Sequence, residues 1–396
     1  MSQKEGYINF EEYSQVGEPQ KAERAYAWST AIGLQAVDGL TVSQYLKETA
    51  VRNIEGEISI DEARELIKTY YQTKTSREPD DEEKQEADKV SGNIAKIIAE
   101  QSFSFSVPTL ISFHRHIFEG VFKHAGELRP YDITKKEWVL RGDTVLYGRS
   151  QDLRMALEYD MEQERQFDYS GLNMDQVVEH LAKFVSGIWQ IHPFREGNTR
   201  TTAVFTIKYL RSIGFDVTNH LFSMHSWYFR NALVRANYQN IAKDVQRDTR
   251  FLEQFFRNLL MGERNELRNR YMLVNSPEEL AVPASTPAST PASTPSNTPA
   301  STPSSNCPPF TTDNENILRL VKAIGHRQLS LKEMLAAVGL KDRKNFMEYS
   351  LTPAMSEGFV CLLYPDKPRH PRQKYLLTVK GSALYNELTK DASKLN

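Results

Sequence analysis

A nine-residue stretch, HPFREGNTR, brings together side chains that can handle phosphate chemistry. His192 is its one side chain that can exchange a proton near neutral pH, so it is the natural general base. Glu196 is a hard oxygen ligand of the kind that Mg²⁺ prefers when it also coordinates phosphates. Gly197 and Asn198 precede a predicted helix, whose free N–H groups attract anions, and Arg200 adds a planar cation that fits phosphate oxygens. Each residue alone could be structural, but the ordered set predicts a phosphate-transfer site.

Two helices must position this stretch. Apolar residues recur over Val177–Trp189 at the spacing of one helical face. A second helix is predicted over Thr199–Ser212, and Gly214 ends it. Phe194 is the apolar anchor of the loop between them. The buried side chains that we expect on the second helix are Val204, Ile207 and Leu210.

The stretch resembles the signature of the Fic (filamentation induced by cAMP) family, HxFx[DE]GN[GK]RxxR, and the resemblance covers roughly Phe103–Phe256. The resemblance implies an all-α domain that transfers AMP from ATP to a Ser, Thr or Tyr hydroxyl of a target protein, with Mg²⁺ as the cofactor. The chain is therefore expected to be a Mg²⁺-dependent protein adenylyltransferase whose partners are ATP and a target protein.

The resemblance also implies a role for each residue of the loop. His192 deprotonates the target hydroxyl, which attacks the α-phosphate, and Glu196 binds the Mg²⁺ that bridges the phosphates. Asn198 and the adjacent N–H groups hold the transferring phosphoryl group, and Arg200 stabilises phosphate charge. The residues expected to bind the nucleotide are Phe194, Arg195, Gly197, Asn198, Thr199 and Arg200.

Two positions depart from the family pattern. Thr199 follows the asparagine where the family has Gly or Lys, and Ala203 stands where the family has its last arginine. In the family that arginine is implied to hold the γ-phosphate, so Arg230 or Arg235 would have to substitute for it. Because this arginine is absent, two other hypotheses stay open. One is a Fic-fold phosphotransferase or another nucleotide-dependent transferase, and the other is a DNA-binding regulator that senses nucleotide without turnover.

Two further segments resemble accessory parts of the family. Ile133–Tyr147 alternates apolar residues around a turn, which predicts the β-hairpin flap that aligns the target segment; a plain surface hairpin is the alternative. Residues 38–72 resemble the family's antitoxin units, with Glu55 of VRNIEG in the inhibitory position and a helix predicted over Asp61–Tyr71. An ordinary helix residue is the alternative for Glu55. The expected target-docking residues of the flap are Lys136, Trp138, Leu140 and Val145.

The proline-rich segment 276–309 divides the chain electrostatically. It holds nine of the 18 prolines, and its PASTP repeat predicts an extended spacer. Residues 310–396 carry a net charge of +5, and residues 1–309 carry −7. The charged run Ser76–Lys89 is interpreted as a solvated boundary. The predicted domains are 1–75 (inhibitory), 76–275 (catalytic), 276–309 (linker) and 310–396 (C-terminal).

The C-terminal segment has the element order of a small α+β winged helix. Ser330 and Glu333 have capping-box spacing, Asp342 can cap the next helix, and strands are predicted over 359–364 and 373–378. Its basic residues can contact DNA phosphates, although winged helices also dock proteins. The candidate nucleic-acid contacts are Arg343, Lys344, Lys367, Arg369, Arg372 and Lys374.

Composition sets the remaining expectations. The 396 residues include only two cysteines, which argues against a disulfide scaffold and fits a reducing compartment. No apolar run is long enough for a membrane span, and the N-terminus shows no secretory pattern, so a cytoplasmic location is expected. Assembly into a homo-oligomer is left open.

Overall fold

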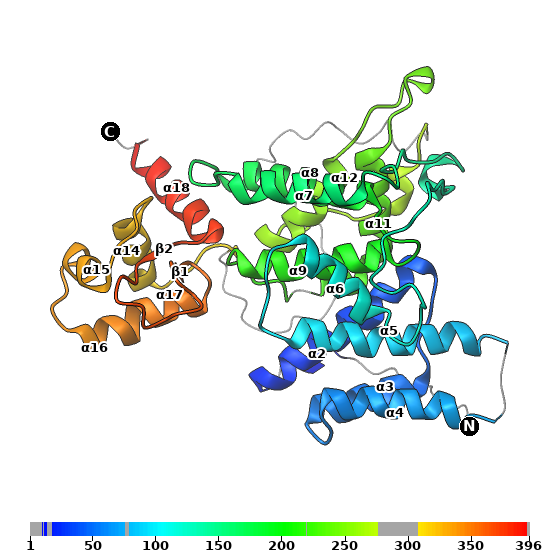
Figure 1. The fold of residues 1–396 in the computed structure, drawn as a ribbon. Coiled ribbons are helices and arrows are strands. Elements are labelled where there is room, and N and C mark those ends of the chain that lie inside the picture. Colours follow the sequence, from blue (N-terminus) through cyan, green and yellow to red (C-terminus); the bar gives the residue numbers. More distant parts are fainter. Residues whose placement is uncertain are drawn as a thin grey trace, which may run out of the picture.

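The computed structural model describes residues 10, 12–13, 18–75, 79–218, 220–275 and 308–393. Within these ranges the fold is mainly α-helical, as predicted, and one two-stranded antiparallel sheet is present (Figure 1). The predicted linker lies outside the described residues except for Pro308 and Pro309. None of the helices described is long and apolar enough to cross a membrane.

The N-terminal helices pack around one long helix, α5 (Asp81–Ala99), at the lower side of the body in Figure 1. Helices α2 (Pro19–Gly33) and α4 (Ile60–Thr73) both contact α5. Helix α3 (Gln44–Glu55) contacts α2 and α4, and the short turn η1 (Leu34–Asp38) follows α2. Helix α4 contains the helix that the sequence predicted in this region.

The described part of the charged run Ser76–Lys89, residues 79–89, is not the fully solvated segment that was expected. This part forms the first half of α5, and one apolar cluster extends through Ala25–Val274. Asp88 is fully buried there, and its carboxylate accepts hydrogen bonds from Tyr71 Oη (2.7 Å) and from the backbone N–H of Ser43 (2.9 Å). These bonds compensate the cost of burying a carboxylate, which sequence charge alone does not reveal. The expected boundary near residue 76 therefore does not separate two apolar cores.

Helix α9 (Asn198–Ser212) lies at the centre of the body. It contacts α5, α6 (Val107–Ile117) and α8 (Met174–Ile191), and every residue from Asn198 to Leu210 is buried. Both helices that the sequence predicted around the phosphate-transfer loop are thus present. The expectation of a single buried stripe on α9 was too narrow, because helices cover it on several sides.

The remaining helices complete the upper side of the body in Figure 1. Helices α7 and α11 pack against α8, and α12 packs against α8 and α11. Their bounds are α7 (Leu153–Gln166), α10 (Leu221–Met224), α11 (Ser226–Asn237), η3 (Ile241–Lys243), α12 (Arg250–Phe256), the π-helical turn η4 (Arg257–Met261) and η5 (Asn269–Met272).

The predicted β-hairpin flap, Ile133–Tyr147, contains no strand. It forms a loop around the 3₁₀ turn η2 (Trp138–Leu140), in which the Glu137 N–H donates to the Asp143 carbonyl (2.9 Å). Val139 and Leu140 are both buried although they are neighbours in sequence. Successive residues of a strand point to opposite faces, so a helical turn accommodates this pair where a surface strand could not.

The C-terminal domain has the predicted order of helices and hairpin, and it has an apolar cluster of its own. The pairing of β1 with β2 places Val360 opposite Leu377. The capping box of Ser330 and Glu333 is present, as predicted. The last helix, α18, was not expected from the sequence. The bounds are α14 (Glu315–Ile324), α15 (Leu331–Val338), α16 (Arg343–Phe346), η6 (Met347–Leu351), α17 (Thr352–Ser356), β1 (Val360–Leu362), β2 (Tyr375–Leu377) and α18 (Val379–Ser393).

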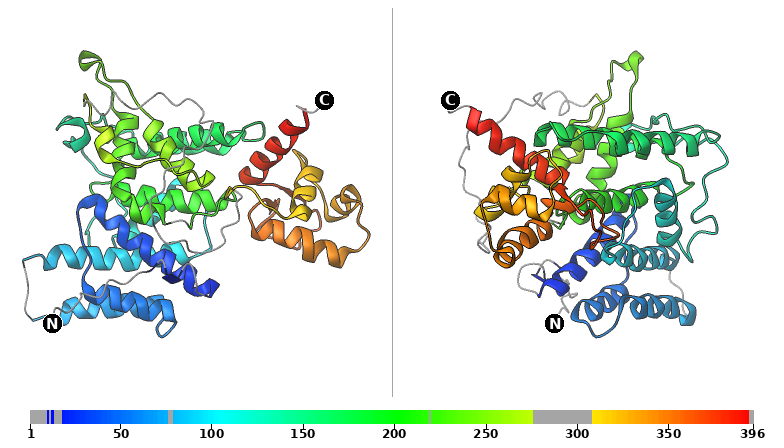
Figure 2. Two further views of the ribbon diagram at one scale, coloured as in Figure 1. Left: turned by 180° about the vertical axis from the view of Figure 1, so that it is seen from behind. Right: turned by 60° about the vertical axis from the view of Figure 1, so that its left-hand side comes forward.

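The C-terminal domain docks on the body at the end of α9 (Figure 2). Gly214 and Gly358 meet backbone to backbone, so closely that a Cβ built on either would lie 2.2 Å from the other's carbonyl oxygen. On the same side, the Asn386 amide donates to the carbonyls of Ser170 (2.9 Å) and Leu172 (2.8 Å). These contacts make a joint with defined geometry.

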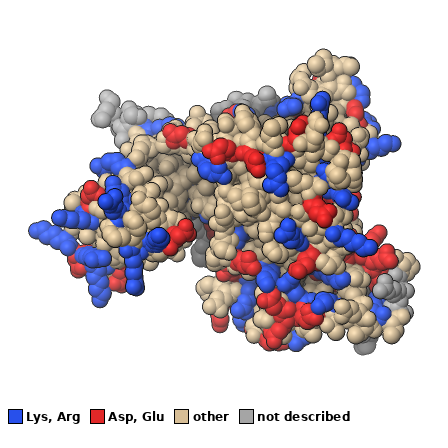
Figure 3. All heavy atoms as spheres, viewed as in Figure 1, with Lys and Arg blue, Asp and Glu red and all other residues tan. Residues whose placement is uncertain are grey.

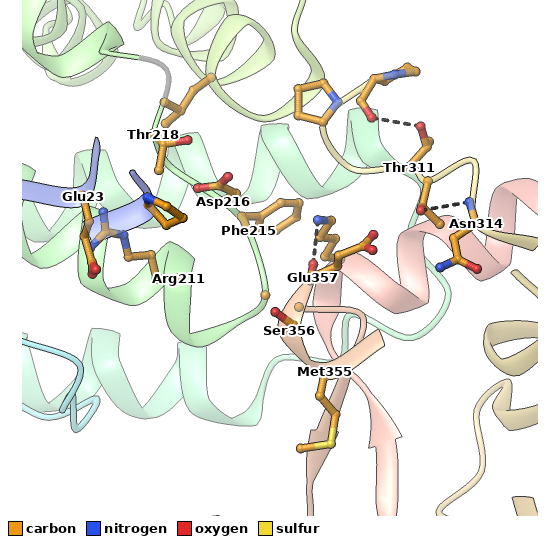
Figure 4. Close-up of a pocket in the computed structure, with 18 of the residues that line it drawn as sticks. Glu23, Arg211, Phe215, Asp216, Thr218, Thr311, Asn314, Met355, Ser356 and Glu357 are labelled. Atoms are coloured by element: carbon orange, nitrogen blue, oxygen red, sulfur yellow. Dashed lines mark hydrogen bonds between the residues drawn. The ribbon is translucent and has the colours of Figure 1, made fainter. Parts of the chain in front are cut away.

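A hollow of about 1270 Å³ opens beside this joint. Figure 4 shows Glu23 and Arg211 of the body on one side of it, and Met355, Ser356 and Glu357 of the C-terminal domain on the other. No residue of the phosphate-transfer loop lines it. The hollow is therefore a feature of the domain boundary.

Candidate active site

His192 occupies the end of α8 in a left-handed backbone conformation, with φ 50° and ψ 58°. This conformation is uncommon for a residue with a side chain, and it turns the chain sharply into the loop. His192 Nδ1 lies 3.3 Å from the Trp189 carbonyl oxygen. Because a carbonyl can only accept, Nδ1 carries the proton and the lone pair is on Nε2.

The environment keeps this imidazole neutral. His192 is 3% exposed, and its Nε2 is buried without a hydrogen-bond partner. Burial, aided by the charge of Lys135, lowers the pKa of His192 well below its ordinary value. The ring of Tyr147, whose centroid lies 4.3 Å away, covers the imidazole. The site thus holds an unprotonated, buried nitrogen with no hydrogen-bond partner.

Arg129, which the sequence argument missed, fixes the backbone at His192. Its guanidinium donates from Nε to the His192 carbonyl (2.8 Å), from Nη1 to the Tyr131 carbonyl (2.6 Å), and from Nη2 to the Gly148 carbonyl. The Arg129 N–H also donates to the Pro193 carbonyl (2.9 Å). This buried arginine therefore fixes the backbone of the loop, although it lies outside the loop in sequence. No motif around Arg129 predicts this role.

Asn198 and Phe194 close the loop on itself. The Phe194 N–H donates to Asn198 Oδ1 (2.9 Å), and Asn198 Nδ2 donates to the Phe194 carbonyl (2.8 Å). The Phe194 ring stacks on His114, with centroids 3.8 Å apart, and His114 Nε2 lies 3.1 Å from the Glu196 carbonyl. Phe194 is an apolar anchor, as expected. The Asn198 side chain also shapes the loop, a role beyond the phosphate contact that the sequence suggested.

Gly197 directly precedes α9 with φ 70°, and a Cβ there would lie 2.1 Å from the Phe118 ring. Only glycine fits both the conformation and the space. The N–H groups of Asn198, Thr199 and Arg200 follow, and as the first residues of the helix they have no intrahelical acceptor. They leave the positive end of α9 available to an anion.

The Glu196 carboxylate is exposed, with 60% of its side chain accessible, at the same end of α9. Its nearest cation is the ammonium of Lys135, 4.0 Å away. In the part of the chain that the structure describes, no group of three His, Cys, Asp or Glu residues could hold a metal. A hard cation here would be bound by one protein carboxylate and by its ligand's oxygens.

Thr199 does not face the loop. Its hydroxyl accepts a hydrogen bond from Trp189 Nε1 (2.9 Å), which ties α9 to α8. Arg195 lies at the outer edge, 3.9 Å from Glu127 and 5.8 Å from the centroid of the Tyr131 ring. The nucleotide-binding role expected for the Thr199 side chain is therefore not supported.

Arg200 is buried and fully engaged by the N-terminal region. Its guanidinium donates to Gln35 (3.0 Å) and Glu86 (2.9 Å), and its Nε lies 2.8 Å from Asp38. It also lies over the Phe118 ring, 4.8 Å from the centroid. The expectation that Arg200 stabilises phosphate charge does not fit this arrangement, because carboxylates already neutralise the guanidinium.

The substitutes considered for the missing arginine are also paired. Ala203 is fully buried in α9. Arg230 Nη1 lies 2.7 Å from Oε2 of Glu137, a carboxylate that is 1% exposed and also accepts from Tyr147 Oη (3.0 Å). Arg235 is buried, with Nη2 4.0 Å from Asp248. Glu137 and Tyr147 thus tie the predicted flap segment to α11.

The remaining predicted residues are dispersed. Glu55 pairs with Lys21 on α2 (2.8 Å), and it does not pair with an arginine of the site. Leu140 and Val145, expected to dock a target, belong to the apolar core, whereas Lys136 is exposed and Trp138 is half-exposed. In the C-terminal domain, Lys374 is half-buried and the other candidate nucleic-acid contacts are exposed.

Two family models match the chain. Residues 104–210 match the Fic/DOC family, and residues 315–378 match the C-terminal domain of Fic-like (filamentation induced by cAMP) proteins. Two proteins named "Probable protein adenylyltransferase Fic", from Salmonella typhimurium and Escherichia coli K12, are each 28% identical over 123 residues. Each match covers 31% of this chain and 58% of the relative.

A crystal structure of a Fic family protein from Desulfovibrio desulfuricans G20 aligns with 90% of this chain and 87% of that chain, at 19% identity and a TM-score of 0.40. The matched segment 104–210 contains the loop, the whole of α8 and nearly all of α9. Residues 104–210 are therefore similar to the Fic/DOC family, and residues 315–378 to the C-terminal domain of Fic-like proteins.

Proposed function

We propose that this chain transfers AMP from ATP to a hydroxyl side chain of a target protein. The name protein adenylyltransferase, carried by both curated relatives, supports this reaction. The observation that carries the proposal is His192: a neutral imidazole with its proton fixed on Nδ1 and an unpartnered Nε2. This base lies in the same loop as the exposed carboxylate of Glu196, and the loop leads into the N–H groups at the start of α9.

The residues around the loop fit Mg²⁺ bound together with a nucleotide. Glu196 supplies one exposed carboxylate, and the N–H groups at the start of α9 supply donors to phosphate oxygens. When bound, Mg²⁺ neutralises charge on the phosphates. These N–H groups hold the α-phosphate, while Arg129 keeps the His192 backbone in place beside it.

The reaction is a displacement at the α-phosphorus. His192 Nε2 accepts the proton of a Ser, Thr or Tyr hydroxyl, and the hydroxyl oxygen attacks the α-phosphorus. The bond from that phosphorus to the bridging oxygen breaks, pyrophosphate leaves, and AMP stays linked to the target. Because Nε2 is buried, the hydroxyl reaches it only after the site opens, which links target docking to a local rearrangement.

Labelled ATP tests the reaction. The full chain is incubated with Mg²⁺, a cell extract, and ATP labelled at the α- or the γ-phosphate. We expect protein label from the α-phosphate, reduced about 10²- to 10⁴-fold by His192→Ala, because a general base contributes that much. His116→Ala, which removes an exposed histidine, is the matched control.

Two other outcomes would replace the proposal. Label from the γ-phosphate alone would establish phosphoryl transfer, the first alternative reaction. No protein label from either position, together with measurable ATP binding, would favour the nucleotide-sensing regulator.

A second function is proposed for the C-terminal domain, which would bind nucleic acid. Lys and Arg side chains gather on it in Figure 3. Lys367, Arg369 and Arg372 are exposed in the connection between β1 and β2, and Arg343 and Lys344 are exposed at the start of α16. Exposed cations of this kind give salt-dependent binding to phosphates.

A gel shift of the full chain with duplex DNA, at low and at physiological salt, tests this function. We expect a shift at low salt that Arg369→Ala/Arg372→Ala weakens. Arg154→Ala/Lys183→Ala, which removes two exposed cations from the body, is the matched control. Absence of any shift at low salt would favour a protein partner for this domain.

A further inference from the structure

Three arginines in or beside the phosphate-transfer loop are already bound. The Arg129 guanidinium donates to the backbone carbonyls of His192 and Tyr131. Arg230 pairs with buried Glu137 at 2.7 Å. Arg200 pairs with Asp38 and Glu86. Each of these arginines would leave a buried partner unpaired if it turned to a phosphate: a backbone carbonyl for Arg129, Glu137 for Arg230, and Gln35 for Arg200. Leaving a buried polar group unpaired is costly.

Lys135 differs from them. Its side chain is one-third exposed, and its ammonium makes one contact in the described part of the chain, at 4.0 Å from Glu196 Oε2. Its backbone is fixed, because the Lys135 N–H donates to Thr144 Oγ1 (3.3 Å). Its charge acts on the imidazole of His192, whose pKa it helps to lower. The ammonium therefore lies beside the Glu196 carboxylate, and its charge is felt at His192.

Position 203 of α9 offers no cation. Ala203 is buried, and its side chain is too short to reach a ligand. A nucleoside triphosphate carries more negative charge than one Mg²⁺ neutralises, so its phosphates need a further cation.

We propose that Lys135 is the phosphate-binding cation of this site and takes the charge of the β- or γ-phosphate, in place of the arginine that Ala203 replaces. The proposal rests on the proposed function of the loop. Binding of a triphosphate exchanges the long contact with Glu196 for short contacts with phosphate oxygens. Lys135 thus sets the preference of the site for a triphosphate over a monophosphate.

The neighbouring lysine provides a matched control. Lys136 is exposed on the same segment, so Lys136→Ala removes the same charge one residue away. Affinities of the full chain for ATP and for AMP are measured by titration calorimetry with Mg²⁺. We expect Lys135→Ala to weaken ATP binding at least about tenfold, because a charge-assisted hydrogen bond contributes this much. AMP binding should change little, Lys135→Arg should retain most of the ATP affinity, and Lys136→Ala should match the wild type.

The results separate this proposal from the proposed function. Equal ATP affinities for Lys135→Ala and Lys136→Ala would overturn the phosphate contact, even if label from the α-phosphate is transferred. A selective loss of ATP affinity in Lys135→Ala, in a chain that transfers no label, would support the contact and overturn the transfer reaction. A wild type that does not bind ATP would overturn both.

Discussion

Helix α9 is bounded at both ends by a glycine with positive φ, Gly197 at 70° and Gly214 at 100°. At the first end, the missing Cβ makes room for the Phe118 ring, and the loop leaves N–H groups and an imidazole for chemistry. At the second end, the missing Cβ lets the backbone of Gly358 approach, so that the two domains meet there. A glycine with positive φ therefore shapes the proposed reaction site at one end of α9 and the domain joint at the other.

Gly197→Ala should have the largest effect. Strain at positive φ and overlap with Phe118 should together cost about 3 kcal/mol or more of stability and abolish transfer. Gly39→Ala is the matched control, because Gly39 has a similar φ of 73° with open space around it. Urea unfolding and α-label transfer measure the two effects. Equal losses of stability and of transfer in both variants would mean that backbone strain alone, and not overlap with Phe118, matters at Gly197.

Acid should remove transfer only well below pH 6.5, the ordinary pKa of histidine. Nε2 acts as a base when unprotonated, so activity is present above the folded-state pKa of His192 and is lost as pH falls through it. Burial places that pKa well below the ordinary value. The pH profile of kcat/KM, with folding checked by circular dichroism, measures the midpoint. A midpoint at 6.5 or higher would contradict the buried neutral base.

Thr199→Val should have an intermediate effect. It keeps the shape of the side chain but leaves Trp189 Nε1 without its acceptor, at a cost of about 1–3 kcal/mol of stability. The KM for ATP should stay unchanged, because the hydroxyl faces α8. A raised KM with normal stability would instead return Thr199 to the nucleotide site.

Gly214→Ala should affect the joint and spare the reaction. A Cβ at this position would overlap the Gly358 carbonyl, so the C-terminal domain should undock while transfer continues. Limited proteolysis and small-angle scattering would detect undocking. Gly339→Ala, with a φ of 72° and no neighbour within 4 Å of its Cβ position, is the control. Loss of transfer in Gly214→Ala alone would show that the joint also supports the loop.

Glu55→Gly should have the smallest effect on transfer. Glu55 pairs with Lys21, and the adjacent Gly56 lines a hollow with Ala95 and Ala99 of α5. Arg200 contacts Glu86, which lies about 14–20 Å from these residues along the same helix. An increase in transfer would show instead that Glu55 inhibits the site, as the family resemblance implied.

Local patterns in the sequence predicted the elements well. The apolar spacing of α8, the capping residues of α15 and the spacing of the loop each depend on neighbours in the chain. The expectations that were wrong depend on distant residues. Asp88 is buried because Ser43 and Tyr71 satisfy it, and Arg200 is neutralised from more than a hundred residues away. The partners of Asp88 cannot be identified from the charged run alone, and the partners of Arg200 cannot be identified from the signature alone.

The proline-rich segment has a consequence for how this chain can vary. Val274 is held before it, where its N–H donates to the Val139 carbonyl (3.0 Å), and Phe310 is buried in the body's apolar cluster after it. Both ends of the segment are thus fixed on the body, and the joint at Gly214 sets the position of the C-terminal domain. The segment closes a loop, and doubling the length of such a loop costs only about 0.6 kcal/mol of entropy. The number of PASTP repeats can therefore change without displacing either domain.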